Sequence, residues 1–311
     1  VYFSTNGFNA DWQDQFQTPQ PNSLSSIIEY AKEHHLENLI LIDNTAAESL
    51  PNRYNDFIDN GFDIVSSNKI ANTLSFEFYK NLRENLKKNQ KQYLYETNVG
   101  AGLPLIDNIK LLHLSGENIT KIKGVFSGTL SYIFNLFSVE NKPFSEVLRA
   151  AIEKGFTEPD PRDDLSGTDV ARKLLILARE LDLENELQDI SIQNLIPTEF
   201  QSLTVQEFLA QLSGLNNHYD DLKQQLKANE VLRYVGELSG DLQQQKGILE
   251  TKLIKVDKNS ALGQLSGSDS IFEIYTESYG DRPIIIQGAG AGAHVTARGV
   301  FGDILRLAEK K

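Results

Sequence analysis

The chain contains no cysteine in its 311 residues. Disulfide bonds are therefore excluded, and the absence is typical of a protein that works in a reducing compartment such as the cytoplasm. The same absence excludes aldehyde dehydrogenases that oxidise their substrate through a cysteine thioester. If the chain is an oxidoreductase, it has to transfer hydride directly between a cofactor and a carbonyl, which is the aldehyde–alcohol class of reaction.

Methionine is also absent, even at the first position, which is Val1. We therefore expect that the chain begins inside a longer protein or was processed. No apolar run is long enough to cross a bilayer, and the first residues lack the basic and apolar pattern of a secretion signal. The formal net charge of −13 argues against nucleic acid and anionic membranes as partners.

Residues 1 to about 103 alternate between helical and strand-like patterns. Apolar residues with helical spacing predict helices at 23–34 and 74–88, and short apolar runs predict strands at 39–43, 62–66 and 92–96. Such alternation predicts a parallel sheet, in which ligands bind beyond the carboxyl ends of the strands. The polar segments at these ends are Asn44–Thr45, Ser67–Lys69 and Glu96–Leu103. We expect a cleft where they meet.

The rest of the chain predicts a second domain of a different kind. Its helical patterns are at 130–137, 144–154 and 167–181, with a long amphipathic stretch at 203–226. Its strand-like runs are 231–237, 248–256, 271–278 and 282–287. Helices followed by antiparallel strands are typical of an α+β domain. We therefore predict the α/β class, with a Rossmann-type parallel sheet domain followed by an α+β domain.

The segment Gly155–Lys173 holds five acidic and three basic residues. Pro159 and Pro161 predict an extended first half, and a helical pattern follows. Asp169 and Lys173 are four residues apart, so one helical turn presents both from the same face. A carboxylate beside an ammonium can bind a zwitterionic small molecule and move one proton. The alternative is a solvated helix start whose charges only pair with one another.

The glycine-rich segment Gly288–Gly292 precedes a helical pattern that opens near Val295. It lacks the G-x-G-x-x-G spacing of a dinucleotide fingerprint, and no strand–helix–strand unit follows it. Two interpretations stay open. The segment contacts a ligand, or it is a tight entry of small residues into a helix.

Four segments in the same order make the chain resemble the homoserine dehydrogenases over nearly its whole length. They are Ser67–Lys69, Tyr95–Pro104, Gly155–Lys173, and Gly288–Gly292 followed by Val295–Ala297. The resemblance is closest to the C-terminal half of the bifunctional aspartokinase–homoserine dehydrogenases. It implies reversible hydride transfer between aspartate 4-semialdehyde and L-homoserine with NADP or NAD, in threonine, methionine and isoleucine biosynthesis. It also implies a homodimer or larger assembly through the second domain, and an aspartokinase domain fused to it in the parent protein. We expect the assembly to be cytoplasmic, because the chain has no cysteine.

The resemblance also implies roles for individual residues. Lys173 matches the catalytic lysine that relays the hydroxyl proton, and Asp169 matches a residue that holds the substrate and orients this lysine. Lys69 matches a second active-site lysine that meets cofactor or substrate. The substrate-binding acids are matched by Glu158, Asp164 and Asp169. The cofactor contacts are matched by Asn44, Thr45, Lys69, Gly155 and Gly292.

A monovalent cation such as sodium is a further cofactor that the resemblance implies. Its ligands are the side chain of Glu96 and the backbone carbonyls of Val99, Ala101 and Leu103. Such hard oxygen ligands suit an alkali or alkaline-earth ion. The alternative for Glu96 is a buried carboxylate at the end of a strand, paired with a backbone N–H group.

The family's nucleotide-binding domain begins with a strand, a glycine fingerprint and a helix, and none of these precedes the first matched residues. We therefore expect a truncated Rossmann-type domain in 1–103, completed by 293–311, and a catalytic and dimerisation domain in 104–292. Without the fingerprint we expect weak or no dinucleotide binding, negligible turnover and a less stable first domain. The alternatives are a catalytically silent structural and dimerisation fragment, or a generic acidic binding module in which Lys173 affects stability alone.

Overall fold

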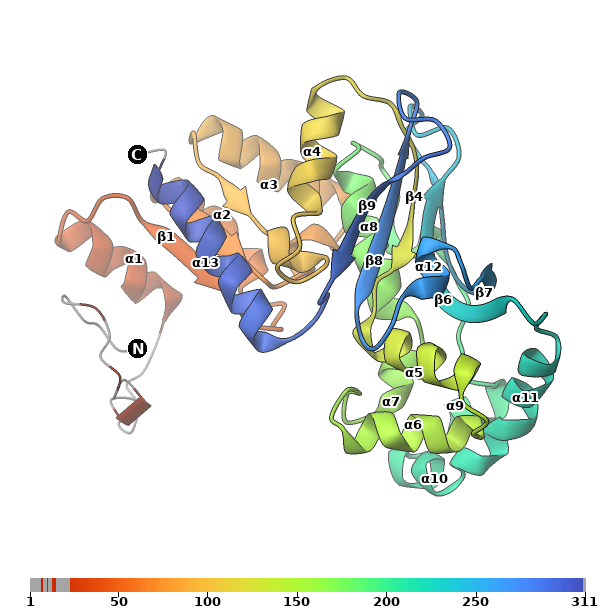
Figure 1. The fold of residues 1–311 in the computed structure, drawn as a ribbon. Coiled ribbons are helices and arrows are strands. Elements are labelled where there is room, and N and C mark those ends of the chain that lie inside the picture. The colour runs from red at the N-terminus through yellow and green to blue at the C-terminus, as the bar shows by residue number, and fades with distance from the viewer. Residues whose placement is uncertain (1–6, 8–9, 11–12, 15–22, 310–311) are drawn as a thin grey trace.

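The computed structural model describes residues 7, 10, 13, 14 and 23–309. Figure 1 shows two sheets side by side, one built early in the chain and one built mostly late. The first has three parallel strands, and the second has six strands of mixed direction. The predicted α/β class is confirmed. In the described part of the chain, no helix is both long and apolar enough to cross a membrane.

The first domain alternates helices with short parallel strands. The strands, in their order across the sheet, are β1 (Ile40–Asp43), β2 (Asp63–Ser66) and β3 (Tyr93–Leu94). The helices are α1 (Leu24–Glu33), α2 (Tyr54–Asp59) and α3 (Phe76–Lys88). All five predicted elements of this region are present, and α1 and α3 begin after Ser23 and Ser75, whose hydroxyls cap them.

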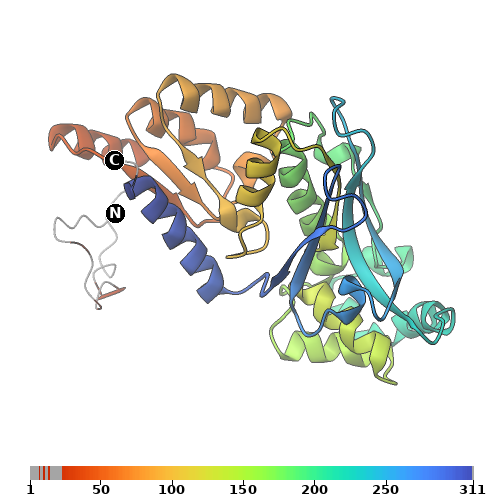
Figure 2. The same ribbon diagram turned by 45° about the horizontal axis from the view of Figure 1, so that its top comes forward.

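Both faces of this sheet are covered, which explains why its strands are continuous apolar runs. Ile64 of β2 packs into the core with residues of α2 and α3, whereas its neighbour Val65 packs against Val300 and Leu307. These two belong to the last helix, α13 (Ala293–Glu309). Figure 2 shows α13, in blue, along the face of the sheet opposite α3. The end of the chain therefore returns to the first domain.

The third strand is shorter than the predicted run 92–96, because the chain turns away at Glu96. A short 3-10 turn covers Glu96–Asn98. The Glu96 carboxylate accepts the backbone N–H groups of Ile106 (2.8 Å) and Asp107 (2.9 Å), at the start of α4 (Ile106–Leu114). The first N–H groups of a helix have no partner within it, so Glu96 caps α4 from outside.

The second domain has a six-stranded sheet in the order β5-β7-β6-β4-β8-β9. Its strands are β4 (Ile119–Val125), β5 (Ser191–Ile192), β6 (Glu230–Ser239), β7 (Ile248–Asp257), β8 (Ser270–Thr276) and β9 (Ile284–Gly288). All pairs are antiparallel except β5 with β7. The four predicted strand runs of this region are confirmed as β6 to β9.

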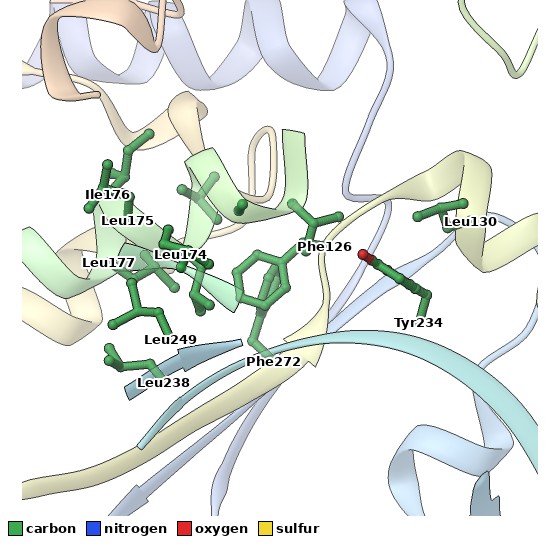
Figure 3. Close-up of a cluster of buried hydrophobic side chains, with 14 of the residues drawn as sticks. Phe126, Leu130, Leu174, Leu175, Ile176, Leu177, Tyr234, Leu238, Leu249 and Phe272 are labelled. Atoms are coloured by element: carbon green, nitrogen blue, oxygen red, sulfur yellow. The ribbon is translucent and has the colours of Figure 1, made fainter. Parts of the chain in front are cut away.

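Helix α8 covers one face of this sheet, and its first turns contain the last residues of the charged segment, including Asp169 and Lys173. The helices of the domain are α5 (Gly128–Val139), α6 (Phe144–Glu153), α7 (Pro161–Leu165), α8 (Thr168–Arg179), α9 (Thr198–Gln201), α10 (Val205–Ala210), α11 (Asn216–Gln224) and α12 (Ala261–Gln264). Figure 3 shows Leu174 and Leu177 of α8 beside Leu238 and Leu249 of the sheet, all fully or nearly fully buried. This burial fixes α8 against the sheet.

One local prediction was wrong. Pro161 does not extend the chain but opens α7, because Asp160 accepts the N–H of Arg162 at 3.0 Å and caps the helix, and proline suits a first helical turn. The amphipathic stretch 203–226 contains α10, a 3-10 turn and α11. Gly214 lies in that turn, close enough to the ring of Phe200 that any larger residue would collide with it.

Candidate functional site

A cavity of about 260 Å³ lies where the two domains meet α13. Its wall includes Lys69, which follows β2, and Lys173 of α8. The remaining wall consists of small or polar residues: Ser67, Thr97, Asn98, Gly100, Ala101, Gly290, Ala291, Gly292 and Thr296. The strand-end segments, the charged helix and the glycine-rich segment therefore meet at one place. For Gly288–Gly292 this favours the first interpretation, that it faces a ligand.

Three charged side chains meet at this cavity. The ammonium nitrogen of Lys173 lies 2.8 Å from Oδ2 of Asp169, and that of Lys69 lies 3.7 Å from Oδ1 of the same carboxylate. Lys173 also donates to the backbone carbonyl of Phe126, at 2.9 Å. The predicted pairing of Asp169 with Lys173 on one helical face is present. Its carboxylate is shared with a lysine from the other domain.

The surroundings change the acidity of two members of this group. Loss of water around Asp169 favours its neutral form, but the charges of Lys173 and Lys69 outweigh this effect and lower its pKa to about 2. Burial lowers the pKa of Lys69, and the charges of Lys173 and Arg172 lower it further, against the opposing effect of Asp169. Asp169 therefore stays ionised, and Lys69 gives up a proton more easily than an ordinary lysine.

The start of α8 is placed by a contact that only glycine allows. Gly167 has φ +76°, and a Cβ atom there would lie 2.0 Å from the hydroxyl oxygen of Tyr234. That hydroxyl donates to the carbonyl of Gln193 (2.7 Å) and shares a hydrogen bond with the hydroxyl of Thr251 (2.9 Å). Gly167 therefore lets α8 begin against the sheet, two residues before Asp169.

Two more acids of the charged segment lie near Asp169. The carboxylate of Asp164 accepts the backbone N–H of Glu158 at 2.8 Å, and the Glu158 side chain is exposed. Burial raises the pKa of Asp164, and the negative charges of Glu158 and Asp169 raise it further. Neither Glu158 nor Asp164 forms an ion pair with a described residue, so these two carboxylates suit a ligand that carries an ammonium group.

The other predicted cofactor contacts lie outside the cavity wall. Thr45 is held by the buried Asp43, which accepts both its N–H (2.9 Å) and its hydroxyl (2.8 Å). Asn44 accepts the hydroxyl of Ser67 at 2.9 Å. Gly155 is exposed with φ +69° and has no neighbour within 4 Å of its Cβ position. Of the five predicted contacts, the wall contains Lys69 and Gly292.

Glu96 and the carbonyl groups of the following loop do not form an acid-rich metal site. Within residues 23–309 and the few described before them, no group of three or more His, Cys, Asp or Glu side chains could hold a metal ion. Glu96 caps α4, as the alternative for this residue predicted. Burial raises its pKa to about 8, and the neighbouring Asp107 contributes to the shift. The cation at Glu96, Val99, Ala101 and Leu103 stays a prediction.

The cavity wall contains several small residues and a polar group without a partner in the described part of the chain. The hydroxyl of Thr97 is buried and has no hydrogen-bond partner among the described residues, so it is free to bond a ligand. Gly100, Ala101 and Gly290 leave room beside it. Sequence reasoning did not single out Thr97 as a residue of the cavity wall, although it lies inside the recognised segment Tyr95–Pro104. It also missed the Phe126 carbonyl, for which no side-chain signal exists.

Comparison with known proteins gives one consistent result. Residues 104–305 match the homoserine dehydrogenase family, and residues 6–96 match the homoserine dehydrogenase NAD-binding domain family. A homoserine dehydrogenase of Paracoccidioides brasiliensis is 38% identical over 327 residues, which covers 97% of this chain and 84% of that protein. A bifunctional aspartokinase/homoserine dehydrogenase of Haemophilus influenzae is 41% identical over 305 residues. The alignment covers 97% of this chain and 37% of that relative, so the chain spans about a third of the bifunctional proteins.

Solved structures agree with the fold. A Candida auris protein of unknown function superposes with a TM-score of 0.88 at 36% identity, covering 99% of this chain and 87% of that chain. A hyperthermophilic archaeal homoserine dehydrogenase in complex with NADPH gives a TM-score of 0.70 at 24% identity, covering 94% of this chain and 77% of that chain. The second likeness concerns the fold alone.

Proposed function

The chain belongs to the homoserine dehydrogenase family, and we propose that it interconverts aspartate 4-semialdehyde and L-homoserine with NADP or NAD. The observation that carries the proposal is the carboxylate of Asp169 held between Lys173 and Lys69 at the cavity lined by the glycine-rich segment. The match of residues 6–96 to the homoserine dehydrogenase NAD-binding domain family supports a nicotinamide cofactor. The choice between NADP and NAD, and the pathway to threonine, methionine and isoleucine, are part of the proposal.

The reaction needs a proton at the substrate oxygen. When bound, a reduced nicotinamide would supply the hydride for the aldehyde carbon, and the substrate oxygen would need a proton to become the hydroxyl of homoserine. Lys173 is the donor we propose, because Asp169 and the Phe126 carbonyl fix its ammonium at 2.8 Å and 2.9 Å. Lys69, whose pKa is lowered, is the second lysine able to exchange that proton.

The substrate's own ammonium needs an anionic partner. We assign this role to Glu158 and Asp164, with Asp169 beside them. The carboxylate of Asp164 already accepts the N–H of Glu158, whereas the carboxylate of Glu158 is exposed and is therefore the one we expect to bind the ammonium. A charge-assisted hydrogen bond to one of them would orient the substrate with its carbonyl carbon toward Lys173.

The cofactor site is proposed for the wall of small residues. Thr97 and Gly292 would contact the nicotinamide end, with Lys69 beside it. Gly155, Asn44 and Thr45 belong to this proposal on the resemblance, at a greater distance from the ring. The alternative, a catalytically silent structural fragment, predicts no binding. Calorimetric titration with NADPH separates the two, because the proposed enzyme binds and the silent fragment does not.

A monovalent cation such as sodium is proposed to hold the loop after β3. Glu96 and the carbonyls of Val99, Ala101 and Leu103 would bind it with oxygen atoms alone. The Glu96 carboxylate accepts two backbone N–H groups, which leaves lone pairs for an ion. Replacing sodium by tetramethylammonium, which is too large for such a site, should lower the protection of this loop in hydrogen exchange.

A homodimer through the second domain is also proposed, and this assembly would lie in the cytoplasm. The sheet face away from α8 carries exposed apolar residues at its two sides, Ile248 (58% exposed) and Ile285 (47% exposed). Between them lies the ion pair of Lys123 and Glu237, at 3.7 Å. A second copy would cover this face. A fused aspartokinase domain is proposed on the bifunctional relatives.

The proposed activity is tested by following NADPH oxidation with aspartate 4-semialdehyde in the full-length protein. Turnover that depends on both substrates and falls on Lys173→Ala supports the proposal. A protein that binds NADPH but gives no turnover with the semialdehyde would contradict the assigned substrate.

A further inference from the structure

A second cavity, of about 310 Å³, lies away from the proposed active site, between α5, β6 and the loop around α12. Its apolar wall includes Leu136, Val139, Val231 and Leu265. Val139 is 71% exposed at the surface of α5, although it is apolar. The cavity therefore offers apolar surface that the described residues do not cover.

The charges around this cavity have one sign. Its wall contains two cationic side chains, Arg233 and Lys258, and no acidic side chain. The chain as a whole has 43 acidic and 30 basic residues, so a cationic wall runs against the overall balance. A ligand for this cavity is expected to carry a negative charge.

Arg233 is a buried cation without a counter-charge. It is 3% exposed, and its hydrogen bonds go to backbone carbonyls: Leu262 (2.9 Å), Leu232 (2.7 Å), Gly263 (2.8 Å) and Leu265 (3.1 Å). None of the described carboxylates forms an ion pair with it, and burial alone lowers its pKa to about 10. A guanidinium has five N–H donors, so one at Nη1 is left for a ligand.

Asn135 provides a second free group on the same wall. Its amide nitrogen donates to the carbonyl of Gly267 (2.8 Å) and to the hydroxyl of Ser131 (3.2 Å), which fixes the orientation of the amide. Its amide oxygen is buried and accepts no hydrogen bond from any described residue. A buried acceptor of this kind normally has a donor, so the ligand is expected to supply one.

We propose that this cavity binds an apolar α-amino acid. The ligand's carboxylate pairs with Arg233 and Lys258, its ammonium donates to the amide oxygen of Asn135, and its side chain packs on Leu136 and Val139. The wall requires a ligand with a negative charge, a hydrogen-bond donor and an apolar group, and an apolar α-amino acid has all three. The proposal does not depend on the proposed dehydrogenase activity.

The loop behind this cavity also touches the proposed active site. A Cβ atom on Gly128, at the start of α5, would lie 3.1 Å from the carbonyl of Ser268, and one on Gly290 would lie 2.0 Å from the hydroxyl of Ser270. Gly290 lines the cavity of Lys69 and Lys173. A ligand that shifts residues 266–270 is therefore in a position to affect the other site.

Isothermal titration with L-leucine tests the proposal. We expect a Kd of about 1 mM or tighter, weakened about tenfold or more when 4-methylpentanoate or isopentylamine replaces leucine, because each lacks one charged group. Lys258→Glu should weaken leucine binding about tenfold, whereas Lys255→Glu should change it less than about twofold. Lys255 is the matched control for Lys258. Both lysines are exposed, each donates to a backbone carbonyl, and they are three residues apart. Only Lys258 lines the cavity.

Three results would overturn the proposal. No heat at about 10 mM leucine, or equal effects of the two lysine substitutions, would remove it. Leucine binding that is lost on Glu158→Gln but kept on Lys258→Glu would place the ligand in the proposed active site instead. If Val139→Asp dissolves a dimer in light scattering and leucine has no effect, a second copy of the chain covers this surface.

Discussion

Replacing Gly167 by alanine should shift the start of α8 without changing Asp169 or Lys173, so it tests whether the position of the helix matters for stability and activity. The new Cβ would lie 2.0 Å from the Tyr234 hydroxyl oxygen and 2.9 Å from the ring carbon that carries it, so the ring has to move. The left-handed backbone at φ +76° costs an alanine about 1–2 kcal/mol. Loss of the two hydrogen bonds of the buried Tyr234 hydroxyl adds about 1 kcal/mol each.

The free energy of unfolding should therefore fall by about 3–4 kcal/mol in Gly167→Ala, measured by urea titration. Gly116→Ala is the matched control, because Gly116 also has a positive φ (+81°) but no neighbour within 4 Å. It should lose only the backbone cost, about 1–2 kcal/mol. In a Tyr234→Phe background, Gly167→Ala should cost only about the 1–2 kcal/mol of the backbone, because the hydrogen bonds that it would break are already absent.

A second readout links this contact to function. Moving the start of α8 displaces Asp169 and Lys173 together, so kcat/KM should fall in Gly167→Ala and stay near normal in Gly116→Ala. Equal losses of unfolding free energy in the two variants, within about 0.5 kcal/mol, would refute the reasoning that the Tyr234 contact sets the position of the helix.

Three further predictions follow from the charges and surfaces. Glu158→Gln should raise KM for the substrate with little change in kcat, because it removes the counter-charge of the ammonium; an unchanged KM in steady-state kinetics would exclude that role. Asp169 has a folded-state pKa of about 2, below its unfolded value, so its contribution to stability is present above about pH 4 and is lost as the pH falls through 2. Urea titrations at several pH values measure the difference in unfolding free energy between the unsubstituted chain and Asp169→Asn. This difference should become smaller as the pH falls from about 4 to 2. A constant difference would show that Lys173 and Lys69 do not stabilise the charge of Asp169. Light scattering should show a dimer at micromolar concentration that Ile285→Asp weakens, whereas Leu114→Asp, at an exposed position of α4, should not; a monomer in the unsubstituted chain would rule out the proposed interface.

Sequence periodicity predicted the elements that bury apolar faces. The strands at 39–43 and 62–66 and the helices at 74–88 and 167–181 agree with the structure because each has a regular apolar pattern that its neighbours cover. Where a polar contact decides where a helix or strand begins or ends, the apolar pattern did not predict that boundary. The third strand ends early because Glu96 caps α4, ten residues further on, and Pro161 starts a helix because Asp160 caps it.

The candidate site was predictable in part for the same reason. Helical spacing alone placed Asp169 beside Lys173, since four residues make about one turn. The approach of Lys69 to Asp169 depends on how the two domains and α13 pack, and here only the resemblance brought Lys69 into the site. The second cavity could not be predicted from the sequence. Its argument depends on two structural facts, that no described carboxylate pairs with Arg233 and that the amide oxygen of Asn135 accepts no hydrogen bond from a described residue.

The most direct test of the central claim is the turnover of Lys173→Ala with saturating NADPH and aspartate 4-semialdehyde in the full-length protein. Loss of a positioned proton donor should lower kcat by about 10²–10⁴ while the urea midpoint stays near that of the unsubstituted protein. Arg172→Ala is the control, since this neighbouring cation is exposed on α8 and does not line the cavity, and its kcat should stay within about threefold. A near-normal kcat in Lys173→Ala, or an equal loss in both variants, would contradict the account.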